Sequence, residues 1–439
     1  MEKKNVFSAI GGFFAAIGKG FMRLSFIVRV LIGLAVGIIL ALLLPEATFI
    51  GVLGSFFTGA LKAIAPVLVF ILITSALASA GKNLKARFAR VITLYMGTTV
   101  LAAVISVVAS FIFRLTIPLV VDKPSGYVPP SGLSEVFTTL LTNLVQNPVT
   151  ALANGNYVGI LFWSIMLGIA LRALASDKTK ETINDLSLAV GKIVSWVIQL
   201  APLGVMGLVF SSVSELGMAI FVDYGRLVLL LVGCMLFTSL VINPFLVFLF
   251  LRKNPYPLVL RCLKESGLQA FFTRSSAANI PVNMKLCDEL GLDKEYYSVA
   301  IPLGATINMD GAAITITVMS LAAAFTRGIE VNVFVAILLS LVATLGACGA
   351  SGVPGGSLLL IPMACSLLGV DAGTAMEVVG VGFVIGVVQD SLETALNSSG
   401  DVMFAATAEF ADWKKQGKPI YFTEKGKALA ESTTEGEEA

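Results

Sequence analysis

The chain has 439 residues, of which 56% are hydrophobic and 13% charged, with a mean hydropathy of +0.90. A soluble domain carries about 25% charged residues, so this composition indicates a polytopic membrane protein and excludes an ordinary soluble enzyme. The net charge of +2 says little about partners, no basic cluster with interleaved aromatic residues suggests a nucleic acid, and the absence of histidine excludes imidazole catalysis and most zinc sites.

The N-terminal segment, residues 1–22, is basic and has Phe-rich apolar steps. It lacks a compact apolar core followed by a cleavage site. We therefore expect an interfacial amphipathic helix and not a signal peptide.

Six apolar runs are long enough, or nearly so, to cross a membrane. They predict spans at about residues 24–44, 57–79, 91–120, 157–175, 188–214 and 225–251. Lysine and arginine gather at alternate ends of these runs, and the opposite loops hold one lysine between them, Lys123. By the positive-inside rule the N-terminus is cytoplasmic. The charged, Glu-rich segment 414–439 is expected to be a disordered cytoplasmic tail.

The second and fifth spans resemble each other. An Ala-Pro pair is followed by a serine nine positions after the proline in both, at Pro66 and Ser75 and at Pro202 and Ser211. The two spans enter the membrane from opposite sides, so the pattern suggests an inverted repeat.

Beyond residue 255 the apolar segments are interrupted by Gly, Ser and Pro, in 268–282 and again in 341–362. Each half is too short to cross about 30 Å of hydrocarbon. Paired broken segments of this kind are the best sequence indication of a transporter binding site. We expect two helical hairpins whose tips meet near mid-membrane, the first entering from the cytoplasm and the second from outside.

The last apolar segment carries acidic groups. On a helix, polar residues of the stretch 389–401 stack on one face: Asp390, Glu393, Thr394, Asn397 and Asp401. Acidic groups in hydrocarbon are costly and normally mark an ion or substrate path.

The charges of these segments do not balance. Arg274 faces four acids, Asp310, Asp390, Glu393 and Asp401, which leaves −3 if all ionise. A buried carboxylate protonates or binds a cation. The missing charge must come from solution, as sodium or as protons, and both remain open. The five scattered cysteines show no metal-binding or disulfide pattern.

The segment Asn308-Met309-Asp310-Gly311 adds a second indication. Asn308 and Asp310 point about 200° apart on a regular helix, so both can face one ion only if the helix unwinds, which Gly311 permits. Unwound carbonyls suit a cation and hairpin helix N-termini suit a carboxylate, so the site fits a zwitterion such as an amino acid. Tyr95, Thr98 and Thr99 place three hydroxyls on one helical face but on their own fit a structural role.

Taken together, the motifs resemble the dicarboxylate/amino acid:cation symporter family, which has the glutamate-transporter fold. They are Tyr95-x-x-Thr98-Thr99, Thr273-Arg274-Ser275-Ser276, the run from Pro302 to Gly311, Gly352-Val353-Pro354-Gly355 and Asp390 to Asp401. The resemblance covers about residues 24–412, and 389–401 is most similar to the bacterial serine/threonine:sodium branch.

The resemblance implies an all-α polytopic membrane protein with eight transmembrane helices, two re-entrant hairpins and inverted repeats, assembled as a homotrimer in lipid. It also implies a division into the N-terminal helix 1–22, scaffold helices in 23–80 and 121–220, a transport domain in 81–120 and 221–413, and the tail 414–439.

The resemblance also transfers ligands to numbered positions. Sodium ligands are expected at Tyr95, Thr98, Thr99, Gly304, Thr306, Asn308, Asp310, Ala347, Cys348, Ala350, Asn397 and Asp401. Substrate contacts are expected at Ser276, Val353, Gly355, Asp390, Glu393, Thr394 and Asn397.

Two departures from the family bear on the substrate. Members that take acidic substrates have Arg where this chain has Glu393, and Thr where it has Ala312. A glutamate there would repel a substrate carboxylate, so a small neutral amino acid fits better. The alternative for Glu393 is an ion pair with Arg274 that has no part in selectivity.

We therefore expect sodium-coupled uptake of serine or threonine across a bacterial inner membrane, with both termini cytoplasmic, by an elevator-type mechanism. Sodium is the coupling ion, and no enzyme activity or other cofactor is expected. The alternatives are a proton-coupled carrier of the same fold, a channel with acidic rings, or an intramembrane aspartyl protease built on Asp310 and Asp390.

Overall fold

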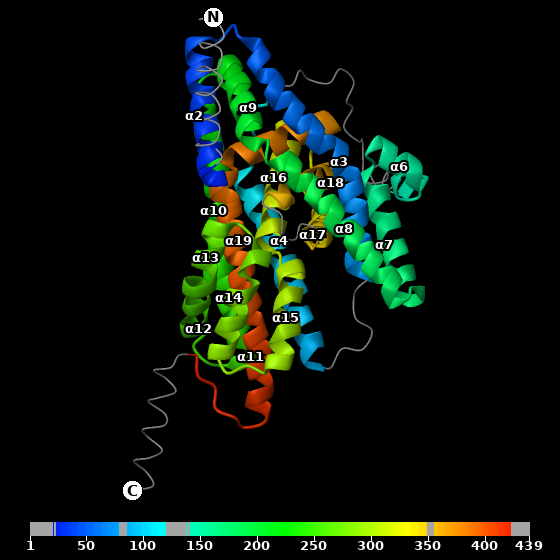
Figure 1. Cartoon of the computed structure of the whole chain (residues 1–439), viewed down its shortest axis with the longest axis vertical. Helices are drawn as coiled ribbons and strands as arrows, with labels where there is room; N and C mark the ends of the chain where they lie inside the picture. Colours follow the sequence, from blue (N-terminus) through cyan, green and yellow to red (C-terminus); the bar gives the residue numbers. More distant parts are fainter. Residues whose placement is uncertain are drawn as a thin grey trace, which may run out of the picture.

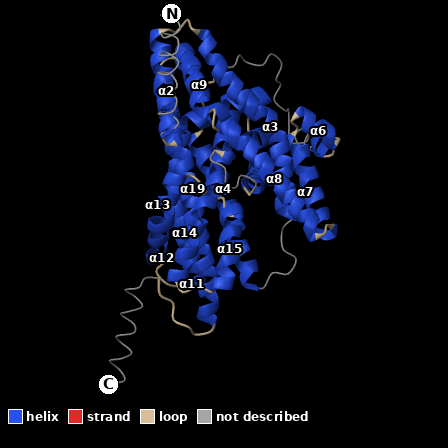
Figure 2. Cartoon of the chain, viewed as in Figure 1, coloured by secondary structure: helices blue, strands red, loops and turns tan. Residues whose placement is uncertain are grey.

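The computed structural model describes residues 21, 23–78, 86–119, 138, 141–348 and 355–422. All regular structure in these ranges is helical (Figure 2). The helix expected in 1–22 lies outside these ranges except for Phe21. Residues 349–354 of the second hairpin and the segment 423–439 also lie outside them.

Seven helical stretches of the described chain are long and apolar enough to cross a membrane. They are α2 (Phe26–Leu43), η1–α3 (Thr48–Ile50 and Gly51–Ala78), α4 (Ala86–Phe113), α7 (Tyr157–Leu174), α10–η2–α11 (Ile220–Phe237, Thr238–Ile242 and Asn243–Leu251), α15–α16 (Lys294–Ile307 and Asp310–Thr326) and α19 (Ala372–Lys415). A bent pair, α8 (Asp177–Ile198) and α9 (Ala201–Leu216), makes an eighth if it is counted as one span. The chain is therefore a polytopic helical membrane protein.

The bent pair corrects one sequence prediction. Residues 188–214 are expected as one continuous span, but the chain bends by 51° between α8 and α9. Pro202 lies in the first turn of α9, where its missing N–H costs nothing, and proline disfavours a helix continuing through the residues before it. The short helix α6 (Pro148–Asn154) precedes α7 and is capped by Asn147.

Helix α9 packs against both α2 and α3 through small residues (Figure 1). A Cβ at Gly37 of α2 would lie 2.6 Å from the carbonyl oxygen of Met206, and one at Gly54 of α3 would lie 2.7 Å from the Leu208 nitrogen. Backbones approach this closely in membranes only where side chains are absent, so these glycines hold the three helices together.

Two groups of short helices lie between the spans, and each folds into two arms; we call each group a helix pair. The first pair comprises α12 (Tyr256–Cys262), the π-helical η3 (Leu263–Gly267) and α13 (Leu268–Thr273), followed after a two-residue turn by α14 (Ser276–Glu289). The second comprises α17 (Val333–Ala347), the 3₁₀ turn η4 (Gly356–Leu360) and α18 (Ile361–Leu367). In the first pair the amide of Asn279 donates to the Ser266 carbonyl at 3.2 Å, so its two arms pack against each other.

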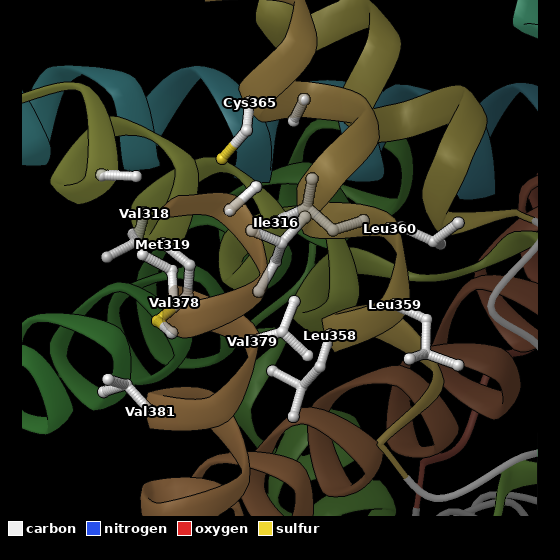
Figure 3. Close-up of a cluster of buried hydrophobic side chains, with 14 of the residues drawn as sticks. Ile316, Val318, Met319, Leu358, Leu359, Leu360, Cys365, Val378, Val379 and Val381 are labelled. Atoms are coloured by element: carbon white, nitrogen blue, oxygen red, sulfur yellow. The ribbon is translucent and has the colours of Figure 1, made fainter. Parts of the chain in front are cut away.

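Helices α16 and α19 form the centre of the molecule. Every residue of α16 from Asp310 to Ala324 is buried, and most of α19 is buried although it is 44 residues long. Figure 3 shows side chains of these two helices packed with those of η4 and α18, among them Ile316, Leu358 and Val379. By contrast, Leu43 of α2 is 72% exposed, as expected for a face that meets lipid or another protein. The polar residues of α16 and α19 therefore lie deep inside the protein.

The end of α19 moves the boundary of the expected tail. The helix continues to Lys415, and the following residues return to the bundle, where Ile420 is buried and its carbonyl accepts from Lys253 Nζ at 3.3 Å. The prediction of disorder from residue 414 is therefore wrong for 414–422. The hydrophobicity pattern of the sequence could not predict this return to the bundle, because a single buried apolar residue, Ile420, holds the segment there.

Candidate functional site

The site is built where α15 ends and α16 begins. Asn308 (φ −91°, ψ 81°) and Met309 (φ −123°, ψ 47°) leave helical geometry between the two helices. The expected unwound turn is thus present, but Gly311 does not make it. Gly311 lies inside α16, where a Cβ would come 2.7 Å from Cα of Glu393, so this glycine lets α16 approach α19.

The side chain of Asn308 joins the unwound turn to α19. Its Nδ2 donates to the carbonyl oxygen of Asn397 at 2.9 Å and to Oδ1 of Asp401 at 3.0 Å. Gly304 leaves room for this group, because a Cβ there would lie 2.8 Å from Asp401 Oδ1. Asn308, Asn397 and Asp401 therefore form one contiguous polar node.

Helix α4 covers this node with hydroxyl groups. The Tyr95 hydroxyl donates to the Asp401 carbonyl at 2.9 Å, and Thr99 Oγ1 donates to Asp310 Oδ1 at 3.1 Å. Thr98 Oγ1 lies 3.5 Å from Asn308 Oδ1, at the limit of a hydrogen bond. The three hydroxyls that fit a structural role by sequence alone thus lie at the site, where Thr99 bonds to a carboxylate, Tyr95 to a backbone carbonyl and Thr98 approaches an amide oxygen.

Asn243 is a member of this group that sequence reasoning missed. Its Nδ2 donates to Asp310 Oδ2 at 3.3 Å, and its own Oδ1 is buried without a hydrogen-bond donor in the described ranges. The signal was available, since Asn243 is an isolated amide inside the apolar run 225–251. An amide there is costly unless it is bonded.

Asp390 lies at the other end of the polar face of α19. Its Oδ2 accepts from Arg274 Nε at 2.6 Å and its Oδ1 accepts from the Gly355 N–H at 3.2 Å. Arg274 adopts the left-handed conformation (φ 53°) at the turn between α13 and α14, and Gly355 (φ 72°) precedes η4. One carboxylate therefore contacts both pairs of short helices.

Glu393 does not pair with Arg274. Its Oε2 accepts from Thr315 Oγ1 at 2.8 Å, from Ser357 Oγ at 2.9 Å and from the Gln389 amide. The alternative of an Arg274–Glu393 ion pair is thus wrong, because Asp390 occupies the guanidinium. Thr315 and Gln389 were missed by sequence, although Gln389 stands one helical turn before Glu393.

The other expected ligands differ in their burial and in their hydrogen-bond partners. Thr306 is exposed and its hydroxyl bonds to the Leu303 carbonyl, while Ala347 is buried and Cys348 Sγ lies 3.7 Å from the Ile307 carbonyl. Ser276 is buried at the start of α14, and Thr394 Oγ1 donates to the Asp390 carbonyl at 2.7 Å. Two expected ligands, Ala350 and Val353, lie outside the described residues.

A second polar network, absent from the sequence predictions, joins α14 to α19. Asn279 Nδ2 and Asn283 Nδ2 donate to Ser398 Oγ at 2.8 and 3.0 Å, and Asn283 Nδ2 also lies 3.4 Å from Asp401 Oδ2. These amides lie on one face of α14 at i and i+4, which predicts a shared partner. They fix the first helix pair against the acid-bearing helix.

The charge of the site is unbalanced in the structure as well. The four acids are each at most 6% exposed, and Arg274 pairs with Asp390 alone. Within the described ranges, Asp310, Glu393 and Asp401 have no lysine or arginine nitrogen within 4.0 Å. Carboxylate, amide and carbonyl oxygens converge there, and hard cations such as sodium bind such oxygens. The arrangement can therefore hold cations. Asp310 accepts from Thr99 and Asn243, whereas Asp390 accepts from Arg274 and Gly355. No hydrogen bond joins the two carboxyl groups within the described residues, which disfavours an aspartyl-protease pair.

Known proteins are similar to this chain over most of its length. The profile of the sodium:dicarboxylate symporter family matches residues 26–410. The chain is 58% identical over 396 residues to a Bifidobacterium adolescentis protein named serine/threonine transporter SstT, an alignment that covers 90% of this chain and 92% of the relative. It is 55% identical over 391 residues to a protein of the same name from Streptococcus agalactiae, which covers 89% of this chain and 97% of the relative.

Proposed function

The chain belongs to the sodium:dicarboxylate symporter family, so it is a transporter and not an enzyme, and we propose that it couples the uptake of serine and threonine to sodium. The observation that carries this proposal is the group of four buried acids on α16 and α19 with a single paired arginine. A sodium gradient supplies the cations that this charge imbalance requires.

The two ends of the polar face have different roles in this proposal. Asp390 receives the ammonium of the amino acid, because it contacts both helix pairs and lies next to the Gly355 N–H, a donor suited to the substrate carboxylate. The node of Asn308, Asn397 and Asp401, with Asp310 and the α4 hydroxyls beside it, binds sodium. We assign Asn397 to both the sodium node and the substrate. Its carbonyl oxygen accepts from Asn308, and its side-chain Oδ1 accepts from the Gly311 N–H at 2.7 Å.

We assign the side chain of the substrate to Glu393. Its negative charge excludes aspartate and glutamate, whose second carboxylate would be buried against it without a partner. The names of the two relatives, both serine/threonine transporters, support the same substrate class.

Movement follows the elevator scheme in our proposal, with α2, α3 and α7–α9 as the scaffold and α4 and α10–α19 as the moving body, in a homotrimer in the bacterial inner membrane. A cavity of about 430 Å³ between α3 and α9 on one side and α10 and α19 on the other supports this division. Lys62, Glu215 and Glu377 line it. The cavity leaves this part of the contact unpacked, although Phe57 of α3 packs edge-on against Phe383 of α19 beside it at 4.9 Å between ring centroids. Less packing therefore has to be broken there for the two bodies to slide.

The tip at residues 351–357 is assigned as the outer gate. Within it, Gly355 N–H and Ser357 Oγ bond to Asp390 and Glu393, so this end of the tip is held by the same groups that we assign to the substrate. A single cysteine at Ser351 should react with an external thiol reagent more slowly when serine and sodium are present. Equal rates with and without serine would remove the gate from this segment.

The experiment for the function as a whole is uptake of labelled serine into proteoliposomes. We expect uptake with an inward sodium gradient, none with potassium in its place, and no loss when an ionophore collapses the proton gradient. Uptake that follows the proton gradient instead would establish the proton-coupled alternative, and uptake that does not saturate would indicate a channel.

A further inference from the structure

The hydrogen bonds around Glu393 are distributed unequally between its two oxygens. All three donors in the described chain reach Oε2: the Thr315 hydroxyl, the Ser357 hydroxyl and the Gln389 amide. A carboxylate oxygen holds about two lone pairs, so Oε2 is saturated. Oε1 accepts no hydrogen bond from any described residue, which leaves it available to another donor.

The orientation of the Gln389 amide is set by Glu393. Nε2 of Gln389 donates to Glu393 Oε2 and also to Thr315 Oγ1 at 2.8 Å. Reversing the amide would place its carbonyl oxygen against the carboxylate, which is repulsive. As a result, Oε1 of Gln389 is buried and receives no hydrogen bond from the part of the chain that the structure describes. A buried acceptor without a partner is unfavourable, so something other than the needs of this amide selects the arrangement.

Thr315 completes a closed set of bonds. Its hydroxyl has one proton, which goes to Glu393 Oε2, and its lone pair accepts from Gln389. Thr315 and Gln389 come from different helices, α16 and α19, and both are fully buried. The carboxylate is thereby held in one rotamer with a defined free oxygen.

The free oxygen is placed to meet the side chain of a small amino acid. Asp390 and Glu393 are at i and i+3 of α19, so their Cβ atoms are about 5–6 Å apart. Two hydrogen bonds of about 2.8 Å from these carboxylates can reach the ammonium and the β-hydroxyl of one amino acid. A hydroxyl supplies the one proton that Oε1 lacks, whereas the methyl group of alanine supplies none.

We propose that Gln389 and Thr315 are positioning residues for hydroxyl selectivity: they fix Glu393 so that its Oε1 accepts the side-chain hydroxyl of serine or threonine. The inference rests on the proposed function and names the residues that make it selective. A hydrogen bond to a charged group changes the affinity for a ligand by roughly 10–100-fold. The unmutated protein should therefore bind serine more tightly than alanine by about that factor.

The test measures inhibition constants for two matched pairs of ligands in the proteoliposome assay. Serine is compared with alanine, and threonine with 2-aminobutyrate, which differs from it only by the hydroxyl. In Gln389→Met and Thr315→Val we expect the serine:alanine and threonine:2-aminobutyrate preferences to fall about tenfold, while the alanine constant changes less than about twofold. Thr315→Ser retains the hydroxyl and should retain both preferences.

Thr317→Val is the matched control for Thr315→Val, because it makes the same substitution at another fully buried position of α16. Thr317 lies two residues away on α16, is fully buried, and its hydroxyl has no hydrogen-bond partner among the described residues. The change should leave both preferences unaltered. A purely structural role for Thr315 would weaken all four ligands together, as a general packing defect does.

The outcomes separate the inference from the proposed function. If the unmutated protein takes up serine with sodium but the preferences survive both Gln389→Met and Thr315→Val, the inference fails and the function stands. If the unmutated protein shows no sodium-dependent serine uptake, the proposed function fails. Should one variant not fold, the other decides, because each removes a different bond to the same oxygen.

Discussion

Replacing Asp390 by asparagine should abolish amino-acid binding while the protein continues to bind sodium. The change removes one charge without altering the size of the side chain, and the asparagine oxygen can still accept from the Gly355 N–H. Arg274 would become a buried cation, 8% exposed, without its partner 2.6 Å away. Removing one member of a buried ion pair costs about 3–5 kcal/mol.

The same charge is the one that the substrate ammonium requires. Truncating one partner of a buried, hydrogen-bonded charge pair weakens binding by about 2–5 kcal/mol, which corresponds to roughly a 30-fold or larger loss of serine affinity. Calorimetry with serine in saturating sodium would measure it, and sodium-dependent protection against thermal unfolding would show that the ion site remains. Serine affinity within a fewfold of the unmutated protein would refute the assignment of Asp390.

Asp371→Asn is the matched control, since it is the same substitution at the N-cap of the same helix. Asp371 also pairs with an arginine, Arg327, at 3.3 Å, but its side chain is 39% exposed. Burial alone would raise the pKa of Asp371, yet hydrogen bonds from Thr374 and the charge of Arg327 hold it below its ordinary value. An exposed pair contributes about 1 kcal/mol or less, so serine affinity should not change.

Three further substitutions test other parts of the site. Asp310→Asn should weaken the dependence of uptake on sodium concentration, and an unaltered sodium titration would assign this acid to packing alone. Gly311→Ala should destabilise the protein by about 1–3 kcal/mol in thermal unfolding because its Cβ would lie 2.7 Å from Glu393, whereas Gly233→Ala meets open space and should not. Glu393→Arg, more so with Ala312→Thr, should weaken serine uptake and admit aspartate in competition assays, and strong competition by aspartate against the unmutated protein would contradict the neutral-substrate proposal.

The sequence was sufficient for the features that depend on composition and periodicity. The apolar runs located the spans before residue 255 except for the bend between α8 and α9, and the spacing from Asp390 to Asp401 placed the acids on one buried face. The unwound turn at Asn308 followed from the need for two side chains on opposite faces to reach one site.

What the sequence could not show depends on contacts between distant segments. Nothing local distinguishes Asp390 from Glu393 as the partner of Arg274, because the two acids differ only in how α13 and α16 pack on α19. The partners of Thr315 and Asn243 could not be predicted for the same reason: an isolated amide such as Asn243 indicates that a hydrogen bond is needed, but only the fold shows which residue supplies it. Gly311 shows the reverse error, since a glycine next to a break was read as the hinge when its role is close packing.

The continuity of α19 has a consequence for the linkage between ion and substrate. The 11 residues from Asp390 to Asp401 rise about 16 Å along an unbroken helix. Two unit charges at that separation interact by about 1 kcal/mol at an effective dielectric constant of about 20, which changes affinity only about fivefold. A sodium ion at Asp401 and the substrate ammonium that we assign to Asp390 are like charges and would repel each other weakly, so direct electrostatics between these two groups cannot produce co-transport. Under the proposed function, cooperativity would instead run through the packed contacts of Asn308 and Asn397, which join α15, α16 and α19. By reciprocity, any factor by which sodium tightens serine binding is the factor by which serine tightens sodium binding.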